Sequence, residues 1–369
     1  MTDRNGNPIT FEMAGHVVTA GDKARLEDTI NILQQRIKSN NLMVDKMNLN
    51  NMPPILLDEH AIAKLLPKLD IKAELTALFR ALGEGDAVQP AQTVTDFPTG
   101  AGDFITYMGA IKSAGVFGAK LSPYIVTGAK PIITAWTTLM SMQTGQPLVW
   151  CDAGALTTER TAGTTALAVD LLAPRSVRRL AIIGSGPVAQ AHLRHVATLR
   201  NWDQIAVYSP NLTLERATQW QNFDQRILIA ATSSDCLDAS DVVMLCTSSG
   251  TPVIDPADTK KPSLFTSIST NAPNAHEVPP AFLTMSQVYC DYLATTAQSA
   301  AEMRLAEQNH GWSADQIIGD LAGIVCGSCA QPSADRPVYF RSIGLGLEDI
   351  AMAYGIWKLA QSNDEWRTT

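Results

Sequence analysis

The stretch "VRRLAIIGSGPVAQAHLRHVATLR" (177–200) joins a short strand, rich in β-branched residues, to a helix through two glycines. In this context the pattern G-x-G-x-x-A predicts a dinucleotide-binding turn. The first glycine makes the tight turn, the second lets the backbone approach a pyrophosphate, and a small third residue permits close helix packing. A proline at the first helical position has no N–H to leave unsatisfied, and the free N–H groups beside it bind phosphate. The candidate cofactor-binding residues here are Gly184, Ser185, Gly186, Pro187, Val188 and Ala189.

Further strands follow this turn, separated by segments of helical length. Strands that alternate with helices indicate βαβ units, and their right-handed crossovers predict a doubly wound parallel sheet, hence an α/β fold. The expected strands are "DQIAVYS" (203–209), "RILIAA" (226–231), "DVVMLC" (241–246), "LFTSIS" (264–269) and "QVYCD" (287–291).

The end of the second expected strand bears on the choice of cofactor. An NAD-preferring site usually has an acidic residue there to hold the ribose 2′-OH, whereas this strand ends in Tyr-Ser-Pro-Asn (208–211). No carboxylate repels a 2′-phosphate, and Ser209, Asn211 and Arg216 are available to receive one. We therefore expect NADP(H) as the preferred cofactor and NAD(H) as the alternative, and we add Thr247, after "DVVMLC", to the cofactor-binding residues.

Composition excludes several classes of function. The 369 residues, 46% hydrophobic and 17% charged, fit a globular protein of about two domains. A net charge of −8 argues against nucleic acid or an anionic membrane as partner. No secretory leader or apolar run of about 20 residues stands out, and six dispersed cysteines fit a reducing compartment. We expect a cytoplasmic protein with a small-molecule substrate.

The two ends of the chain differ from this central region. Residues 1–52 form a polar, Asn-rich extension, in which Leu26, Ile30, Leu33 and Ile37 are spaced as one stripe of an amphipathic helix. Near the other end, "RPVYFRSIGLGLEDIAMAYGIWKLA" (336–360) is interpreted as a glycine-rich turn and an amphipathic helix. Its acidic pair Glu348-Asp349 is expected to cap that helix and is assigned no catalytic role.

Two further patterns are given ordinary structural interpretations. Cys326 and Cys329 form a CxxC without a second ligand pair, so we interpret them as two thiols in a loop. His192 and His195 lie three residues apart on the helix after the glycine turn and are assigned to packing or surface. No metal site is assigned.

Two basic residues lie before the glycine turn in unusual surroundings. Lys120 stands in "SAGVFGAKLSPYIV" (113–126), an apolar run spaced for a buried strand. Because lysine is rarely buried without a partner, it either reaches out to water or faces an internal site. Arg160 follows Thr157, Thr158 and Glu159, where either threonine can cap a helix. An arginine at a helix start opposes the dipole, which an anionic ligand would offset, although pairing with Glu159 at the surface is the ordinary alternative.

Seven segments, taken together, resemble the ornithine cyclodeaminase/mu-crystallin family over residues 53–365. They are "VQPAQTV" (88–94), "GAKL" (118–121), "TGQPL" (144–148), "TTERTAGTTALA" (157–168), "GSGPVAQAH" (184–192), "NAPNAHEV" (271–278) and "RSIGLGLEDIAMA" (341–353). The resemblance implies a homodimer in which a Rossmann domain, residues 162–324, is inserted into a discontinuous α+β substrate and dimerisation domain, residues 53–161 plus 325–369.

The resemblance also implies roles for single residues. Lys120 matches the family's active-site lysine, and Arg160 matches the arginine that binds the substrate carboxylate beside the nicotinamide. Arg160 is therefore assigned to catalysis, to substrate binding and to cofactor binding. Gln92 stands where many members have a carboxylate-binding arginine. Asn271, also counted among the catalytic residues, replaces the aspartate of the cyclodeaminase, and an asparagine cannot act as a base.

The function that follows is an NAD(P)H-dependent oxidoreductase acting on the C–N bond of a small amino or imino acid. We expect reduction of a cyclic ketimine, pyrroline- or piperideine-2-carboxylate, or the reverse dehydrogenase reaction. Lys120 would transfer the proton, and loss of Arg160 would mainly raise KM. The alternatives are ornithine cyclodeaminase, against which Asn271 argues, and a non-catalytic mu-crystallin-like binding protein.

Overall fold

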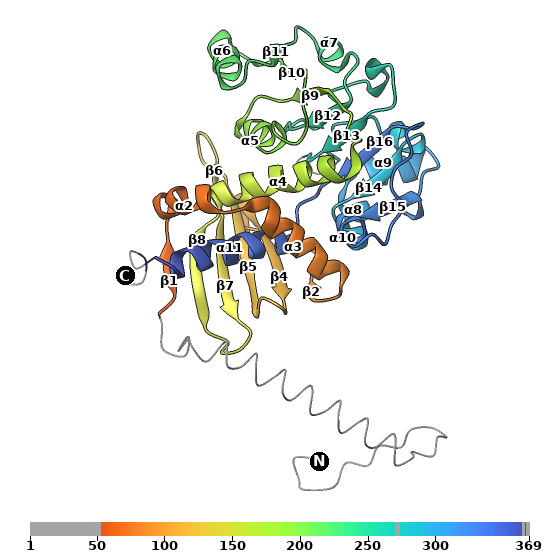
Figure 1. Ribbon diagram of the computed structural model, residues 1–369. Coiled ribbons are helices and arrows are strands. Elements are labelled where there is room, and N and C mark those ends of the chain that lie inside the picture. Colours follow the sequence, from red (N-terminus) through yellow and green to blue (C-terminus); the bar gives the residue numbers. More distant parts are fainter. Residues whose placement is uncertain (1–52, 270–273, 364–365, 367–369) are drawn as a thin grey trace, which may run out of the picture. The chain divides into compact units, whose positions relative to one another are not determined.

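Two separate β-sheets with their covering helices organise the chain (Figure 1). The computed structural model describes residues 53–269, 274–363 and 366, which belong to one compact unit. The helix predicted within residues 1–52 lies outside the described residues. Among the residues described, no helix is long and apolar enough to cross a membrane.

The first sheet is largely antiparallel and has the order β1-β8-β7-β5-β4-β2, with β3 added to β4 and β6 added to β5. Only β1 runs parallel to its neighbour, β8, within this sheet as described. Its strands are β1 (Ile55–Leu57), β2 (Ala87–Val88), β3 (Thr93–Asp96), β4 (Gly102–Ile111), β5 (Val116–Ile125), β6 (Ile132–Ile133), β7 (Trp136–Ser141) and β8 (Pro147–Asp152).

The two faces of this sheet have different surroundings. Side chains alternate between faces along a strand, and on β5 Val116 and Lys120 are buried whereas Phe117 and Leu121 are exposed. The buried face is covered by α11, which packs across β4, β5, β7 and β8 (Figure 1). Lys120 therefore points into the layer between sheet and helices.

Four helices cover the buried face; α11 packs on the strands and on the other three helices, and α2 and α3 also reach the strands at the two ends of the sheet. They are α2 (Glu59–Leu65), α3 (Ile71–Gly83), α4 (Gly154–Leu172) and α11 (Gly346–Gln361). The prediction of an amphipathic C-terminal helix is wrong. α11 is enclosed on nearly all sides and exposes only Lys358, because it packs on strands on one side and on helices on the other.

The second sheet is entirely parallel in the described residues, with the order β11-β10-β9-β12-β13-β16-β14-β15. All six strands predicted from the sequence are present, so the predicted doubly wound α/β fold is confirmed. The strands are β9 (Arg179–Ile183), β10 (Gln204–Tyr208), β11 (Ile227–Ile229), β12 (Val242–Leu245), β13 (Leu264–Ser267), β14 (Gln287–Cys290), β15 (Ile317–Asp320) and β16 (Val338–Arg341).

The strand order places the glycine turn at the topological switch point of this sheet. β10 lies on one side of β9 and β12 on the other, so the loops at their carboxyl ends diverge and leave a crevice. Gly184 follows β9 directly. The associated helices are α5 (Pro187–Val196), α6 (Leu214–Phe223), α7 (Ser233–Leu237), α8 (Leu293–Ser299), α9 (Ala301–Asn309) and α10 (Leu321–Cys326).

Two features bear on the expected domain boundaries at 161/162 and 324/325. Helix α4 runs without interruption through the first boundary. β16 lies beyond the second boundary, yet it pairs with β13 and β14 inside the parallel sheet. Its sequence "VYFR" is rich in strand-forming residues. We therefore propose that the chain returns to the first sheet after Arg341, rather than at residue 325.

Candidate active site

The amine of Lys120 is enclosed between β5 and the helices that cover it, and the residue is only 1% exposed. Its Nζ lies 2.9 Å from Asp349 Oδ2 and donates a hydrogen bond of 3.3 Å to Thr157 Oγ1. It also lies 4.2 Å from the centroid of the Tyr107 ring, a cation–π contact. Of the two interpretations left open by the sequence, the internal one is correct.

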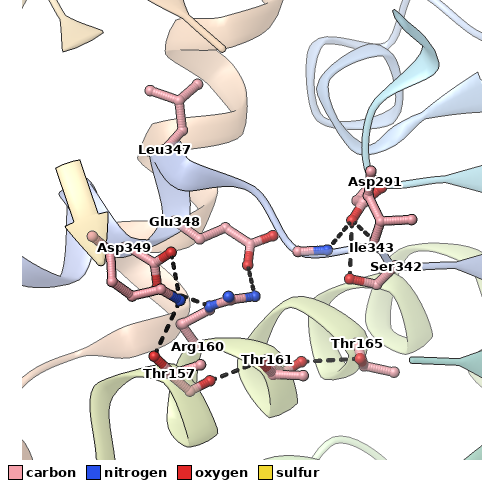
Figure 2. Close-up of polar contacts among 12 residues, drawn as sticks. Thr157, Arg160, Thr161, Thr165, Asp291, Ser342, Ile343, Leu347, Glu348 and Asp349 are labelled. Carbon is pink, nitrogen blue, oxygen red and sulfur yellow. Dashed lines mark hydrogen bonds and ion pairs between the residues drawn. The ribbon is translucent and has the colours of Figure 1, made fainter. Parts of the chain in front are cut away.

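Arg160 lies on α4 and is also buried, 4% exposed. Its Nη1 donates to Glu348 Oε2 at 2.8 Å, and its Nε donates to Asp349 Oδ1 at 3.1 Å (Figure 2). The alternative of a surface arginine paired with Glu159 is wrong, since Glu159 instead contacts Arg194 and His195.

The two acids at the start of α11 therefore join the two basic residues. Asp349 contacts both Lys120 and Arg160, one with each carboxylate oxygen, and Glu348 contacts Arg160. The prediction that these acids cap α11 is wrong, because the cap residue is Leu345 and no side chain caps the helix. We call Lys120, Arg160, Glu348 and Asp349 the charge cluster.

Burial and pairing shift the pKa values within the charge cluster. Burial lowers the pKa of Lys120 to about 8, against the opposing influence of Asp349. Burial raises the pKa of Glu348 to about 7, although the Arg160 guanidinium counteracts it. For Arg160, burial is outweighed by Asp349 and Glu348, which raise the pKa above its ordinary value. Two groups thus have pKa values near neutral pH, where a proton can be exchanged.

The start of α4 differs from the expectation. The helix begins at Gly154, with Ala153 as the cap residue, so neither Thr157 nor Thr158 caps it. Thr157 lies one turn inside, where its hydroxyl accepts the hydrogen bond from Lys120. The helix therefore begins at least four residues earlier than expected, which places Arg160 in the second turn, where the dipole opposes it less.

A groove of about 710 Å³ opens at the carboxyl ends of β9, β10 and β12. All but two of the predicted cofactor-binding residues line it, and so does Arg216. The two exceptions are Ala189, which is buried in the packing of α5, and Arg160, which belongs to the charge cluster. The predicted residues that line it are Gly184, Ser185, Gly186, Pro187, Val188, Ser209, Asn211 and Thr247.

The glycine turn has the shape that a dinucleotide requires. Gly184 has φ +123°, and a Cβ there would lie 2.5 Å from the Cys246 carbonyl oxygen, so only glycine fits. A Cβ on Gly186 would meet nothing within 4 Å, so the space above the turn is open. No side chain caps α5, so its first N–H groups remain available to a phosphate. The residues present fit a nicotinamide dinucleotide.

Two buried carboxylates hold the loops at this edge of the parallel sheet. Glu277 accepts hydrogen bonds from the N–H and hydroxyl groups of Thr247, each 2.8 Å, and from Ser267 Oγ at 2.7 Å. Asp291 accepts from the N–H groups of Ile343 and Gly344 at 2.6 and 2.9 Å (Figure 2). The sequence analysis missed both acids.

The turn that Asp291 holds lies directly against the charge cluster. Gly344 has φ +77°, and a Cβ there would lie 2.4 Å from Arg160 Nη1. This turn follows β16, whereas the groove lies beyond β9, β10 and β12. The charge cluster and the cofactor groove therefore meet the same carboxyl edge of one sheet, where ligands bind in open α/β folds.

The other predicted site residues have the following positions. Gln92 lines a small cavity with Gly344, and its Oε1 is buried without a hydrogen-bond partner among the described residues. Asn271 lies outside the described residues. His192 Nδ1 contacts the carbonyl oxygen of Val188 at 2.7 Å, while Cys326 is an exposed free thiol.

The two acids of the charge cluster are further candidate site residues that sequence reasoning missed. One signal was present: apart from Lys358, Glu348 and Asp349 are the only charged residues in the otherwise apolar α11. A pair of acids in a helix too apolar to be a surface helix indicates internal partners.

A glycine turn at the switch point of a parallel sheet, with an open groove above it, defines a dinucleotide-binding α/β protein. The chain belongs to the ornithine cyclodeaminase/mu-crystallin family, whose model matches residues 54–364.

Individual relatives agree with this assignment. The chain is 50% identical over 309 residues, 84% of this chain and 98% of the relative, to the NAD(P)H-dependent anabolic L-arginine dehydrogenase DauB of Pseudomonas aeruginosa. It is 25% identical to a Delta(1)-pyrroline-2-carboxylate reductase of Colwellia psychrerythraea, over 65% of this chain and 79% of the relative. The crystal structure of a probable ornithine cyclodeaminase from Bordetella pertussis superposes with a TM-score of 0.77 at 25% identity, covering 85% of this chain and 99% of that one.

Proposed function

We propose that this protein is an NAD(P)H-dependent oxidoreductase that reduces the C=N bond of a small imino acid or, in reverse, oxidises an L-amino acid. The observation that carries the proposal is the buried pairing of Lys120 and Arg160 through Asp349. It supplies a proton donor and a carboxylate-binding cation at the sheet edge where the cofactor groove opens.

The glycine turn of 184–186 and the start of α5 would hold the pyrophosphate, and Ser209 and Asn211 would hold the ribose. The bound nicotinamide supplies the hydride. The protein supplies position, charge and the proton.

Arg160 has a planar fork that binds a carboxylate through two hydrogen bonds and fixes the α-carbon in one orientation. Lys120 donates a proton to the imine nitrogen in reduction and accepts one from the amine in oxidation. Asp349 keeps the Lys120 amine in place through the ion pair of 2.9 Å.

The substrate is the finer part of the proposal. The dehydrogenase DauB, 50% identical to this chain, is named for L-arginine, and Gln92 leaves a neutral amide beside Gly344 where the family resemblance predicts an arginine. A neutral lining does not repel a cationic side chain. We therefore place the 2-imino acid of L-arginine beside the cyclic ketimines as candidate substrates.

The test is a substrate panel followed by NAD(P)H absorbance. The panel contains 5-guanidino-2-oxopentanoate with ammonia, pyrroline- and piperideine-2-carboxylate, and L-arginine, L-ornithine and L-proline, each with both cofactors. We expect NADPH consumption with at least one imine or with a 2-oxo acid plus ammonia. Proline and ammonia formed from ornithine without net cofactor change would indicate cyclodeaminase activity, and cofactor binding without any turnover would indicate a binding protein.

Arg216 is expected to favour NADPH over NADH. It lines the groove beside Ser209 and Asn211, where the 2′-phosphate would lie. Arg216→Ala removes a charge-assisted hydrogen bond, so KM for NADPH should rise roughly tenfold, equivalent to about 1.4 kcal/mol. KM for NADH in the same steady-state assay serves as the control and should not change. An equal rise for both cofactors would contradict the role in 2′-phosphate binding.

We further propose that the outer face of the first sheet pairs two copies of the chain. A continuous row crosses five strands in register on this face: Leu56, Trp150, Thr138, Ala119 and Met108. Leu56 and Trp150 are 65% and 53% exposed. Exposed apolar side chains in a contiguous patch mark an interaction surface.

Trp150→Glu is therefore expected to separate the homodimer. A carboxylate at the centre of an apolar interface is left without a partner, so the molar mass by light scattering should halve. Leu214→Glu, which alters an exposed leucine on α6 of the other sheet, is the matched control and should leave the mass unchanged. A monomeric wild-type chain would contradict the proposal.

The six cysteines of the chain are all free thiols, in line with the cytoplasmic location that we propose.

A further inference from the structure

The charge cluster is electrically balanced and closed to water. Its two cations and two carboxylates are Lys120, Arg160, Glu348 and Asp349, with exposed fractions of 1%, 4%, 0% and 3%. A substrate carboxylate that binds Arg160 adds one negative charge to this buried set. An uncompensated buried charge is strongly unfavourable, so a neutralising proton is required.

Glu348 differs from Asp349 in a way that favours it as the proton acceptor. Both oxygens of Asp349 contact cations, whereas Glu348 has a single ion pair, from its Oε2 to Arg160. Glu348 Oε1 is buried and has no hydrogen-bond partner in the described part of the chain. A proton on Oε1 therefore leaves the ion pair of Oε2 with Arg160 intact.

The Thr164 hydroxyl offers an acceptor for such a proton. Thr164 lies on α4, one turn beyond Arg160, and its Oγ1 is likewise buried. The Thr164 hydroxyl faces the Glu348 carboxylate and lowers the pKa of that carboxyl by donating to it; because a hydroxyl both donates and accepts, it can turn to accept once Oε1 carries a proton. Three charged or titratable groups face the Glu348 carboxylate: Arg160 on α4, Asp291 after β14 and Asp349 on α11. Lys120 on β5 also faces it, and Tyr107 on β4 faces its partner Arg160.

We propose that Glu348 is a positioning residue that holds the Arg160 guanidinium and takes up one proton when the substrate carboxylate binds. The inference rests on the proposed function, because it requires a carboxylate ligand at Arg160. The proton comes from solvent, adds to Glu348 Oε1 and returns to solvent when the product leaves. No bond to the substrate forms or breaks in this step, and the net charge of the buried site stays constant.

The pKa of Glu348 places this proton exchange between pH 6 and pH 8. Burial raises its pKa to about 7, so it is mostly ionised at pH 8 and mostly protonated at pH 6. A carboxylate beside it raises the pKa further. Proton uptake on binding should therefore be small at pH 6, about 0.1 proton, and approach about 0.9 proton at pH 8, for a pKa of about 7.

Calorimetric titration measures this uptake directly. The binding enthalpy is compared in buffers of different ionisation enthalpy, at pH 6, 7 and 8, with the full chain saturated with NADP⁺. The probes are 5-guanidino-2-oxopentanoate and pyruvate, which cannot react because ligand and cofactor are both oxidised. We expect the uptake to increase with pH for any probe that binds, and Kd to rise about tenfold per pH unit above 7.

Glu348→Gln keeps the shape of the side chain but cannot take up the proton. In this variant we expect the uptake that centres on pH 7 to be absent, so that Kd is independent of pH between 6 and 7. Glu307→Gln, which changes an exposed acid on α9, is the matched control and should behave as the wild type. If Glu348→Gln does not fold, judged by thermal unfolding, the midpoint of the wild-type pH series decides: uptake that rises around pH 7 indicates Glu348, and uptake that rises only around pH 8 indicates Lys120.

Three outcomes would overturn the inference. Binding without proton uptake at pH 8 would leave the proposed function intact and remove the role of Glu348. Uptake that persists in Glu348→Gln would assign the proton to another group, with Lys120 as the next candidate. If neither probe binds although NADP⁺ does, the carboxylate site at Arg160 is wrong, and the proposed function fails together with the inference.

Discussion

Lys120→Ala is expected to lower kcat for imine reduction by about 10²–10⁴-fold, the usual contribution of a positioned general acid. The amine is held by Asp349 and Thr157 in a site closed to water, so solvent does not replace it as a proton donor. Cofactor binding should remain near normal, because Lys120 does not line the groove. The measurement is steady-state kinetics together with NADPH fluorescence titration.

The pH profile adds a second readout for the same residue. Because burial lowers the pKa of Lys120 to about 8, the protonated amine that reduction needs is lost as the pH rises through that value. Reduction should therefore slow with increasing pH, and oxidation of the amino acid should accelerate. Full kcat in Lys120→Ala, or an identical pH profile in both directions, would show that another group transfers the proton.

Arg160→Met is expected to destabilise the fold by roughly 3–5 kcal/mol, the effect of removing one partner from a buried ion pair. Glu348 loses its ion pair, and Asp349 retains only Lys120. Both carboxylates are buried, so water cannot solvate them. Urea unfolding followed by circular dichroism measures the free energy of unfolding, with the wild type at the same pH as reference.

The double variant Arg160→Met/Glu348→Gln separates charge from packing. Removing the unpaired carboxylate should recover a substantial part of the lost stability, although activity should stay absent in the double variant. The same substitution at an exposed arginine, Arg175→Met, is the control and should alter the free energy of unfolding by less than about 1 kcal/mol. Equal stability of Arg160→Met and wild type would mean that the pairs with Glu348 and Asp349 contribute nothing.

This expectation differs from the one reached from the sequence alone, where loss of Arg160 mainly raises KM. That reasoning considered only the substrate as the partner of the guanidinium. In the structure the guanidinium has two internal partners on α11, Glu348 and Asp349, which lie 188 and 189 residues further along the chain. A pure KM effect is therefore expected only from a variant that keeps both pairs.

The parallel sheet shows how much of the fold can be predicted from short stretches of the sequence. The strands from β9 to β14 are short, apolar runs bounded by turn residues, and each was predicted within a few residues. β16 was not predicted, because its four residues directly precede a glycine-rich turn and were included in the turn-and-helix segment 336–360. α11 was predicted to have one apolar face, because the small number of charged residues in it was not interpreted as a sign of burial on all sides.

By itself, the sequence determined the glycine turn and its phosphate-binding chemistry, because these depend on the residue types within one strand–turn–helix segment. It also predicted the doubly wound sheet, from the alternation of strands and helices along the chain. It also singled out Lys120 and Arg160, but not what they contact. Only the tertiary structure decided that Glu348 and Asp349 face these two cations instead of capping α11. The energy of an ion pair in a buried site depends on the distance between its charges in space. The charged side chains on β5, α4 and α11 become neighbours only when the sheet and the helices pack together.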